Sequence, residues 1–290
     1  MRRPTWCGFL VVLSFPVREV STIMRNQMKH PSLLTMIFSG LGAVVVLFLV
    51  APIIKMMLAG SYDGLGEALS SPEVRNSIAL TMLCALLATA AGLVLGVPFA
   101  YLLARRTFFG KRIVEAIVDV PVVIPHPVVG IALLLVFGRQ FFGGQFLNRF
   151  GITVVGGIAG IVLAMLFVSV PLLINAARDG FQRVDPRLES VARTLGYGPL
   201  RAFMRVSLPL SWRALLSGAI MMWARAISEF GSIVIITYNP KVASVLIYDR
   251  FTSYGLTYAL PVAIVLVLIC LFAFALLRGV NARSNQVKVI

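Results

Sequence analysis

Few residues of this chain could do polar chemistry within apolar surroundings, and three of them stand out. Arg225 and Glu229 lie four residues apart in an apolar run, so on a helix they share one face. His126 lies in a second apolar run, among closely spaced prolines. Ionisable residues inside a membrane span are costly and usually face a protein interior or a water-filled cavity. The pair therefore predicts either mutual neutralisation or the lining of a translocation path, and both interpretations stay open.

The usual catalytic and metal-binding motifs are absent from the sequence. His30 and His126 are the only histidines, and no H-E-x-x-H, G-x-S-x-G or phosphate-binding loop occurs. Cys7, Cys84 and Cys270 are an odd number of isolated cysteines, without a C-x-x-C pair. We therefore expect no enzyme activity in this chain, no metal site and no cofactor.

The composition places much of the chain in lipid. Its 290 residues are 59% hydrophobic and only 13% charged, with a mean hydropathy of +0.94. Open sheet edges cannot face lipid, so the spans must be helices, and each apolar run is long enough to cross a membrane. The prediction is an all-α integral membrane protein with six transmembrane helices, at about 33–58, 76–104, 113–137, 153–177, 214–237 and 258–277.

The net charge is +15, and the positions of the basic residues indicate how the chain is oriented in the membrane. Lysines and arginines gather in cytoplasmic loops of membrane proteins. Nineteen of the 26 basic residues fall on one side of the six predicted spans: in segment 1–32, the loop after the second span, the loop 178–213 and the tail 278–290. We therefore expect a multi-pass protein of the cell membrane with both termini in the cytoplasm, and no nucleic-acid partner.

Residues 1–32 are expected to form an N-terminal cytoplasmic segment. The apolar run 6–15 is too short to span and lacks a small-residue cleavage site. Three interpretations stay open for the first 23 residues: a marginal signal-like segment, a disordered tail, or a start assigned too early, since Met24 and Met28 are equally sensible starts.

The loop 178–213 predicts a short amphipathic helix. Asp185 followed by Pro186 is typical of a helix start, and Gly196 of its end. The apolar side chains at helical spacing are Leu188, Val191, Ala192 and Leu195. The polar side chains away from them are Arg187, Ser190, Arg193 and Thr194. Such a helix lies on a membrane, docks in a partner's groove, or packs under its own bundle.

The third span contains Pro121, Pro125 and Pro127, which break the helical hydrogen-bond ladder. Broken backbone is tolerated in a membrane only where it is buried in protein or lines a cavity. The prolines therefore predict a bend, either a simple kink or part of a pathway. His126 at the bend is expected to pack or form hydrogen bonds rather than bind a ligand directly.

The loop 178–213 resembles that of the type I permease subunits of ATP-binding-cassette (ABC) importers. Their motif is E-A-A-x-x-x-G-x(9)-I-x-L-P. This chain has Ala192, Gly196, Leu208 and Pro209 at the matching positions and spacings. The chain departs from the motif at Ser190, Val191 and Val206. Glu189 is adjacent to the position of the family glutamate, so which polar group makes the family's contact is left open. The resemblance covers about residues 72–277.

Two further stretches narrow the resemblance. Residues 121–130, PVVIPHPVVG, resemble the third-span segment of molybdate and tungstate permeases. Residues 228–231, SEFG, resemble a fifth-span signature that these share with sulfate permeases. The segments 238–240, 245–248 and 254–256 are most similar to the archaeal-type molybdate/tungstate branch. His126 stands where many bacterial members have another proline.

The resemblance implies a permease domain at 72–277 that imports an oxyanion, molybdate or tungstate, by alternating access. It implies a homodimer, two cytoplasmic ATP-binding subunits and an extracytoplasmic oxyanion-binding protein. It also implies a cytoplasmic coupling helix between the fourth and fifth spans, formed by Asp185, Leu188, Glu189, Ser190, Val191, Ala192, Arg193, Thr194, Leu195 and Gly196, with Leu208 and Pro209. The implied pathway and gate residues are Pro121, Pro125, His126, Pro127, Arg225, Ser228, Glu229 and Gly231.

The same sequence leaves three rival functions. A sulfate or thiosulfate permease shares much of the same pattern. A secondary transporter needs intramembrane carboxylates and usually inverted repeats, yet Glu229 is the only acid deep in a predicted span. A membrane enzyme needs a nucleophile with a base or a metal cluster, which the sequence does not provide.

Overall fold

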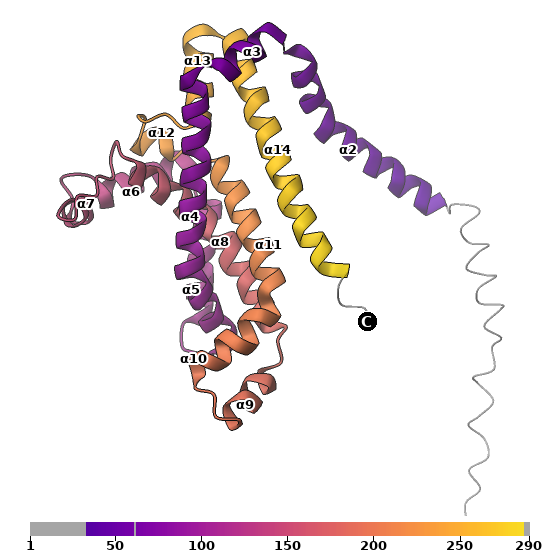
Figure 1. Cartoon of the computed structure of the whole chain (residues 1–290), viewed down its shortest axis with the longest axis vertical. Helices are drawn as coiled ribbons and strands as arrows, with labels where there is room; N and C mark the ends of the chain where they lie inside the picture. Colours follow the sequence, from indigo (N-terminus) through magenta and orange to yellow (C-terminus); the bar gives the residue numbers. More distant parts are fainter. Residues whose placement is uncertain (1–32, 61, 287–290) are drawn as a thin grey trace, which may run out of the picture. The chain divides into compact units, whose positions relative to one another are not determined.

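The computed structural model describes residues 33–60 and 62–286, and it contains no strand within these ranges (Figure 1). The predictions for residues 1–32 and 287–290 lie outside the described residues. The helices are α2 (Leu33–Ala59), α3 (Tyr62–Ser70), α4 (Pro72–Arg105), α5 (Lys111–Val123), α6 (His126–Phe137), α7 (Phe142–Asn148), α8 (Ile158–Gln182), α9 (Pro186–Thr194), α10 (Pro199–Ala202), the π-helix η1 (Phe203–Ser207), α11 (Leu208–Ile227), α12 (Ile233–Ile236), α13 (Ala243–Tyr254) and α14 (Leu256–Gln286).

The chain divides into two units. Helix α2 belongs to the first; it is 27 residues long and highly apolar, and none of its residues is buried. The second unit begins at Gly60 and holds all the other helices. Its length and composition make α2 a membrane-span candidate, as the sequence predicts.

The centre of the second unit is the packing of α4, α8 and α11 against one another. Small residues let these helices approach closely. A Cβ atom added to Gly180 would lie 2.5 Å from the Cβ of Ala214, and one added to Gly218 would lie 2.8 Å from the Cβ of Ala176. Close contact through small residues is the usual way that membrane helices associate, because lipid gives no hydrophobic drive for packing.

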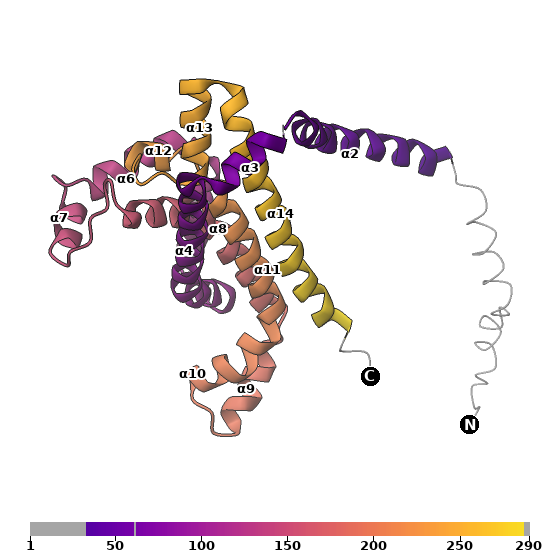
Figure 2. The same cartoon turned by 45° about the horizontal axis from the view of Figure 1, so that its top comes forward.

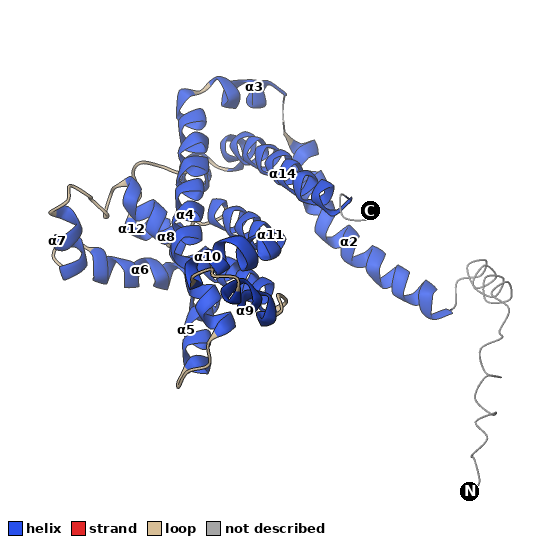
Figure 3. Ribbon diagram, turned by 60° about the horizontal axis from the view of Figure 1, so that its bottom comes forward, coloured by secondary structure: helices blue, strands red, loops and turns tan. Residues whose placement is uncertain are grey.

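The elements around this centre separate into distinct regions. Helices α9 and α10 lie at one end of the bundle, and α3 and α13 lie at the other (Figures 1 and 2). Helices α6 and α7 extend to one side, and α6 packs against α12 (Figure 3). The two regions singled out by the sequence are therefore apart: the amphipathic helix is at one end of the bundle, and the broken segments meet at its side.

The third predicted span, 113–137, is broken as its prolines predict. Helix α5 ends at Val123, α6 begins at His126, and the two are bent by 114°. Ile124 is extended, because a residue before proline is pushed out of the helical region. The sequence placed the bend correctly.

The fourth and fifth spans depart from their predicted bounds of 153–177 and 214–237. Helix α8 begins at Ile158, because Gly156 has a positive φ of 75° and Gly157 is extended. Helix α11 begins at Leu208 and ends at Ile227, followed by a non-helical stretch and the single turn α12. The prediction of a continuous fifth helix through residue 237 is therefore wrong.

Four described helices are long and apolar enough to cross a membrane: α2, α4, α8 and residues 256–275 of α14. The α5–α6 pair makes a fifth if the two count as one bent span. Helix α11 falls outside this set; it is 20 residues long and contains Arg213 and Arg225. The count of six spans therefore stays a prediction.

Candidate functional site

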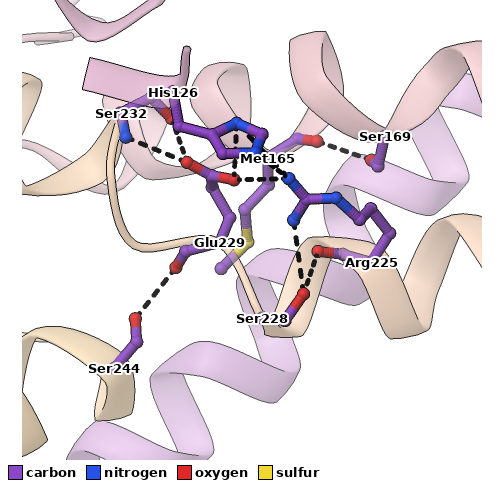
Figure 4. Close-up of polar contacts among 8 residues, drawn as sticks. All are labelled: His126, Met165, Ser169, Arg225, Ser228, Glu229, Ser232 and Ser244. Atoms are coloured by element: carbon purple, nitrogen blue, oxygen red, sulfur yellow. Dashed lines mark hydrogen bonds and ion pairs between the residues drawn. The ribbon is translucent and has the colours of Figure 1, made fainter. Parts of the chain in front are cut away.

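The three ionisable residues singled out in the sequence lie together (Figure 4). Arg225 comes from the last turn of α11, Glu229 from the stretch after it, and His126 from the first position of α6. The Nη2 of Arg225 is 3.2 Å from Oε2 of Glu229 and 2.7 Å from Nε2 of His126. The Nδ1 of His126 is 3.5 Å from the same carboxylate oxygen. These three residues are called the charge cluster below.

Glu229 is the buried centre of the charge cluster. Its side chain is 1% exposed. Oε1 accepts hydrogen bonds from the backbone N–H of Ser232 at 2.9 Å and from its hydroxyl at 2.8 Å, while Oε2 faces Arg225 and His126. The hydroxyl of Ser244 on α13 donates to the backbone carbonyl of Glu229 at 2.9 Å. A buried charge is tolerated only with such partners, so this carboxylate holds α11, α6 and the α12 region together.

Arg225 and His126 are the accessible members of the charge cluster. Their side chains are 27% and 39% exposed. The Nη2 of Arg225 lies 2.7 Å from Nε2 and 3.3 Å from Nδ1 of the His126 ring, and a guanidinium can only donate, so a hydrogen bond here requires the ring nitrogen to accept. The Nη1 of Arg225 also donates to the Ser228 hydroxyl at 3.2 Å. The cluster thus combines charge neutralisation with partial exposure of a cation that an anion could approach.

Glycines allow the two broken segments to meet. A Cβ atom on Gly231 would lie 2.7 Å from the Cβ of His126 and 3.2 Å from Cδ of Pro127. A Cβ atom on Gly130 would lie 2.8 Å from both the Cβ of Ile235 and the carbonyl oxygen of Ser232. Contacts under 3.0 Å leave no room for a side chain. Sequence reasoning singled out Gly231. It missed the close packing at Gly130 and the two hydrogen bonds that Ser232 donates to Glu229.

The prolines around the bend have separate positions. Pro121 is buried within α5, whereas Pro125 and Pro127 are exposed at the start of α6. Pro125 is the residue before the helix, and Pro127 occupies its first turn, where proline's missing N–H costs nothing.

The amphipathic helix forms as predicted, as α9. Oδ1 of Asp185 accepts a hydrogen bond from the backbone N–H of Arg187 at 2.9 Å, and Gly196 ends the helix with a φ of +91°. Ala192 is the one buried residue of α9. The rest of the apolar face, called the apolar stripe below, is exposed: Leu188 at 46%, Val191 at 56% and Leu195 at 76%. Packing of this stripe under the helix's own bundle, one of the sequence alternatives, is therefore not what the described residues show.

Glu189 faces the other way, into the bundle. Its Oε2 accepts a hydrogen bond from the Tyr101 hydroxyl at 2.7 Å. Its Oε1 pairs with Nε of Arg105 at 2.8 Å and accepts a hydrogen bond from the Ser207 hydroxyl. Burial raises the pKa of Glu189, but the hydrogen bonds from Ser207 and Tyr101 and the charge of Arg105 outweigh it and hold the pKa below its ordinary value.

The remaining residues of the predicted coupling segment are arranged more simply. The Ser190 hydroxyl donates to the carbonyl of Pro186 at 3.4 Å, and that of Thr194 to the carbonyl of Val191 at 2.8 Å. Arg193 is exposed in the last turn of α9. Leu208 and Pro209 open α11. Sequence reasoning missed Tyr101 and Arg105, since both are far from the loop in sequence.

A polar cluster at the opposite end of the bundle also escaped the sequence reasoning. Asp249 on α13 pairs with Nζ of Lys241 at 2.6 Å and accepts a hydrogen bond from the Tyr238 hydroxyl. These two hydrogen bonds lower the pKa of Asp249, and the hydrogen bond from Lys241 contributes more than the one from Tyr238. Nearby, Arg250 pairs with Glu73 at 2.9 Å. In the described part of the chain, no group of His, Cys, Asp and Glu could hold a metal ion.

Residues 92–286 match the family model described as binding-protein-dependent transport system inner membrane component. The chain is 44% identical to the molybdate/tungstate transport system permease protein of Thermococcus kodakarensis, over 86% of this chain and 96% of that protein. It is 34% identical to a probable sulfate transport system permease protein of Chlorella vulgaris, over 75% of this chain and 84% of that protein.

Solved structures share the fold. A chain of a bacterial ABC transporter involved in the import of the acidic polysaccharide alginate superposes with a TM-score of 0.68 at 15% identity, covering 92% of this chain and 99% of that one. A chain of the MetNI methionine ABC transporter, in inward-facing conformations, superposes with a TM-score of 0.56 at 16% identity, covering 72% and 93%. At these identities the likeness establishes the fold alone.

Proposed function

This chain belongs to the family of binding-protein-dependent transport system inner membrane components, and we propose that it carries molybdate and tungstate across the cell membrane. It is an ABC transporter permease and has the all-helical fold of type I importers. Permeases of this kind are not enzymes, because ATP is hydrolysed by a separate subunit. The observation that carries the substrate proposal is the 44% identity over nearly the full length of a molybdate/tungstate permease.

The charge cluster is our candidate for the polar part of the translocation path. It joins the bend of the third span to the end of the fifth, and its guanidinium is partly exposed. The prolines of the bend, with Ser228 and Gly231, shape the same region. A tetrahedral dianion needs a site that attracts it but does not hold it, because tight binding prevents release. Arg225 supplies the attraction, and the buried Glu229 limits it.

Helix α9 is our candidate for the coupling contact with the ATP-binding subunit. Its exposed apolar stripe has the spacing of a helix that docks into a hydrophobic groove. Arg187 and Arg193 lie beside the stripe and would set its register at the rim of the groove. In this proposal, ATP-driven closure of two ATP-binding subunits draws two such helices together and turns the permease between inward-facing and outward-facing states.

The assembly follows from these assignments. The transporter has two copies of this chain, two cytoplasmic ATP-binding subunits and an extracytoplasmic oxyanion-binding protein. Both termini face the cytoplasm, as the distribution of basic residues predicts. The end of the bundle that holds α9 then faces the cytoplasm, and the end that holds α3 and α13 faces outward.

Sulfate is the second candidate substrate, since the chain also matches a probable sulfate permease protein, at 34% identity. Reconstitution with the cognate ATP-binding subunit and binding protein separates the two. We expect ATP-dependent, vanadate-sensitive uptake of labelled molybdate that excess tungstate suppresses and sulfate does not. Suppression by sulfate alone would support the second candidate. Uptake driven by an ion gradient without ATP would contradict the importer assignment.

A further inference from the structure

Glu189 forms a clamp that is distinct from the apolar stripe on the same helix. Its two carboxylate oxygens receive donors from three side chains, Tyr101 and Arg105 at the end of α4 and Ser207 at the end of η1. These four residues are called the Glu189 clamp below. The three donors are 18 to 88 positions away from Glu189 in sequence, so the clamp exists only in the folded bundle.

The Glu189 clamp is largely shielded from solvent. The side chains of Arg105 and Glu189 are 11% and 16% exposed, and Ser207 is fully buried. Nη1 of Arg105 also donates to the backbone carbonyl of Val184 at 2.9 Å, one residue before the cap of α9. A shielded, charge-assisted network of this kind is stronger and more rigid than an exposed ion pair.

Aromatic packing also supports the clamp. The Tyr101 ring lies edge-on to Phe181 of α8 at 5.4 Å and to Phe203 of η1 at 4.6 Å between ring centroids. The Tyr101 hydroxyl is therefore held in place by two further elements. Three elements at this end of the bundle, α4, α8 and η1, therefore contribute to fixing the position of one carboxylate on α9.

We propose that Glu189 is a positioning residue that locks α9 to α4 and to the start of α11, so that movement of α9 is passed to the membrane helices. This inference rests on the proposed coupling role of α9. The apolar stripe would bind the ATP-binding subunit. The clamp would prevent local bending of the loop from taking up the movement of α9. Glu189 acts through its own chain and does not contact the ATP-binding subunit.

The position next to Glu189 supports this division of roles. Ser190 is exposed and stands at the position of the family's motif glutamate, whereas both oxygens of Glu189 are occupied inside the bundle. A side chain with 16% exposure and three internal donors has little capacity left for an external partner.

The test uses the full transporter, with two readouts on Glu189→Gln. The first is hydrogen–deuterium exchange of the segment 186–195 in the assembled complex without substrate. The second is the ATP hydrolysed per labelled molybdate imported. Loss of a charge-assisted hydrogen bond changes a local opening equilibrium by about tenfold. We expect exchange in this segment to accelerate by about that factor and the ATP cost per anion to rise, while the ATP-binding subunits still co-purify.

Glu115→Gln is the matched control, because Glu115 is also a half-buried, ion-paired carboxylate but joins α5 to Arg178 of α8. It should leave exchange of 186–195 unchanged. Wild-type exchange and wild-type ATP cost in Glu189→Gln would overturn the proposal. So would loss of the ATP-binding subunits with unchanged exchange, since that result indicates a direct contact.

Two milder variants keep the test decisive if Glu189→Gln fails to accumulate. Tyr101→Phe and Ser207→Ala each remove one donor and keep the packing. Each should give a smaller acceleration of exchange in the same segment, and wild-type exchange in both would overturn the proposal. The exchange readout needs no substrate, so a failed substrate assignment is recognised separately, as absence of molybdate uptake by the wild-type complex.

Discussion

Replacing Glu229 with glutamine tests whether the charge cluster is tuned for weak anion binding. The change keeps the size of the side chain and leaves an oxygen that can accept from Ser232, but it removes the negative charge beside Arg225. The guanidinium then faces the path without a counter-charge. We expect the permease to bind the anion more tightly and to transport it more slowly.

The magnitude follows from the geometry. Arg225 and Glu229 carry opposite unit charges, and two such charges about 4 Å apart attract each other by about 4 kcal/mol at an effective dielectric constant of about 20. The guanidinium is 27% exposed, so water reduces this value, and we take about 1.4 kcal/mol, or a factor of about ten in affinity. Glutamine also places an amide group against the guanidinium, which costs about 1–3 kcal/mol of stability.

The assay is equilibrium binding of labelled molybdate to the detergent-solubilised transporter without its binding protein, paired with uptake in proteoliposomes. Glu229→Gln should bind about tenfold more tightly than the wild type and import more slowly. Glu73→Gln is the control, because Glu73 forms an exposed ion pair with Arg250 and takes no part in the charge cluster. Unchanged or weaker binding by Glu229→Gln, in a variant that assembles normally, would refute the reasoning.

Three further predictions concern other parts of the molecule. Leu195→Asp places a charge in the apolar stripe, so membrane insertion should persist while about 2 kcal/mol of the contact with the ATP-binding subunit is lost and ATP hydrolysis is uncoupled from uptake; normal uptake would contradict the docking role. Gly231→Ala brings a Cβ atom within 2.7 Å of the Cβ of His126, so the transition temperature of the complex should fall by an amount equivalent to about 1–3 kcal/mol; an unchanged value would show that α6 can move aside. The lowered pKa of Asp249 means that its pair with Lys241 stabilises the protein above the ordinary aspartate pKa of 3.8, and that this contribution is lost as the pH falls through the lowered pKa. The stability difference between wild type and Asp249→Asn should therefore be constant from about pH 5 to pH 8 and shrink only in stronger acid, and a difference that vanishes already at pH 5 would contradict the assignment.

Local signals in the sequence predicted the local features well. The Asp185–Pro186 start and the Gly196 end of α9 depend on backbone chemistry within a few residues, as does the bend at Pro125. The spacing of Arg225 and Glu229 predicted a shared face and left pairing as one of two interpretations; the two side chains do pair, although Glu229 lies beyond the end of α11.

The features that sequence reasoning missed depend on contacts between distant segments. The sequence predicts a continuous fifth helix because the run 214–237 is mostly apolar, and periodicity carries no sign that the Ser232 N–H binds a carboxylate instead of continuing the helix. Tyr101 and Arg105 are ordinary residues at the end of a span until the fold brings Glu189 to them. Gly130 matters only because α12 lies against it.

The charge cluster and the Glu189 clamp lie at the two ends of the same helix. Ser207 of the clamp directly precedes α11, and Arg225 of the cluster is in its last turn. At 1.5 Å per residue, the 20 residues of α11 span about 30 Å. Helix α11 packs closely on α8, where Gly180 faces Ala214 and Gly218 faces Ala176, so we expect the two helices to move together there. If α9 couples to the ATP-binding subunit as proposed, we expect a displacement imposed at the clamp to be passed along α11 to Arg225, and α11 ends at Ile227 with a non-helical stretch after it. That stretch contacts the start of α6 through Gly231 and His126, so in the proposed mechanism a motion started at the clamp would reach the bend between α5 and α6.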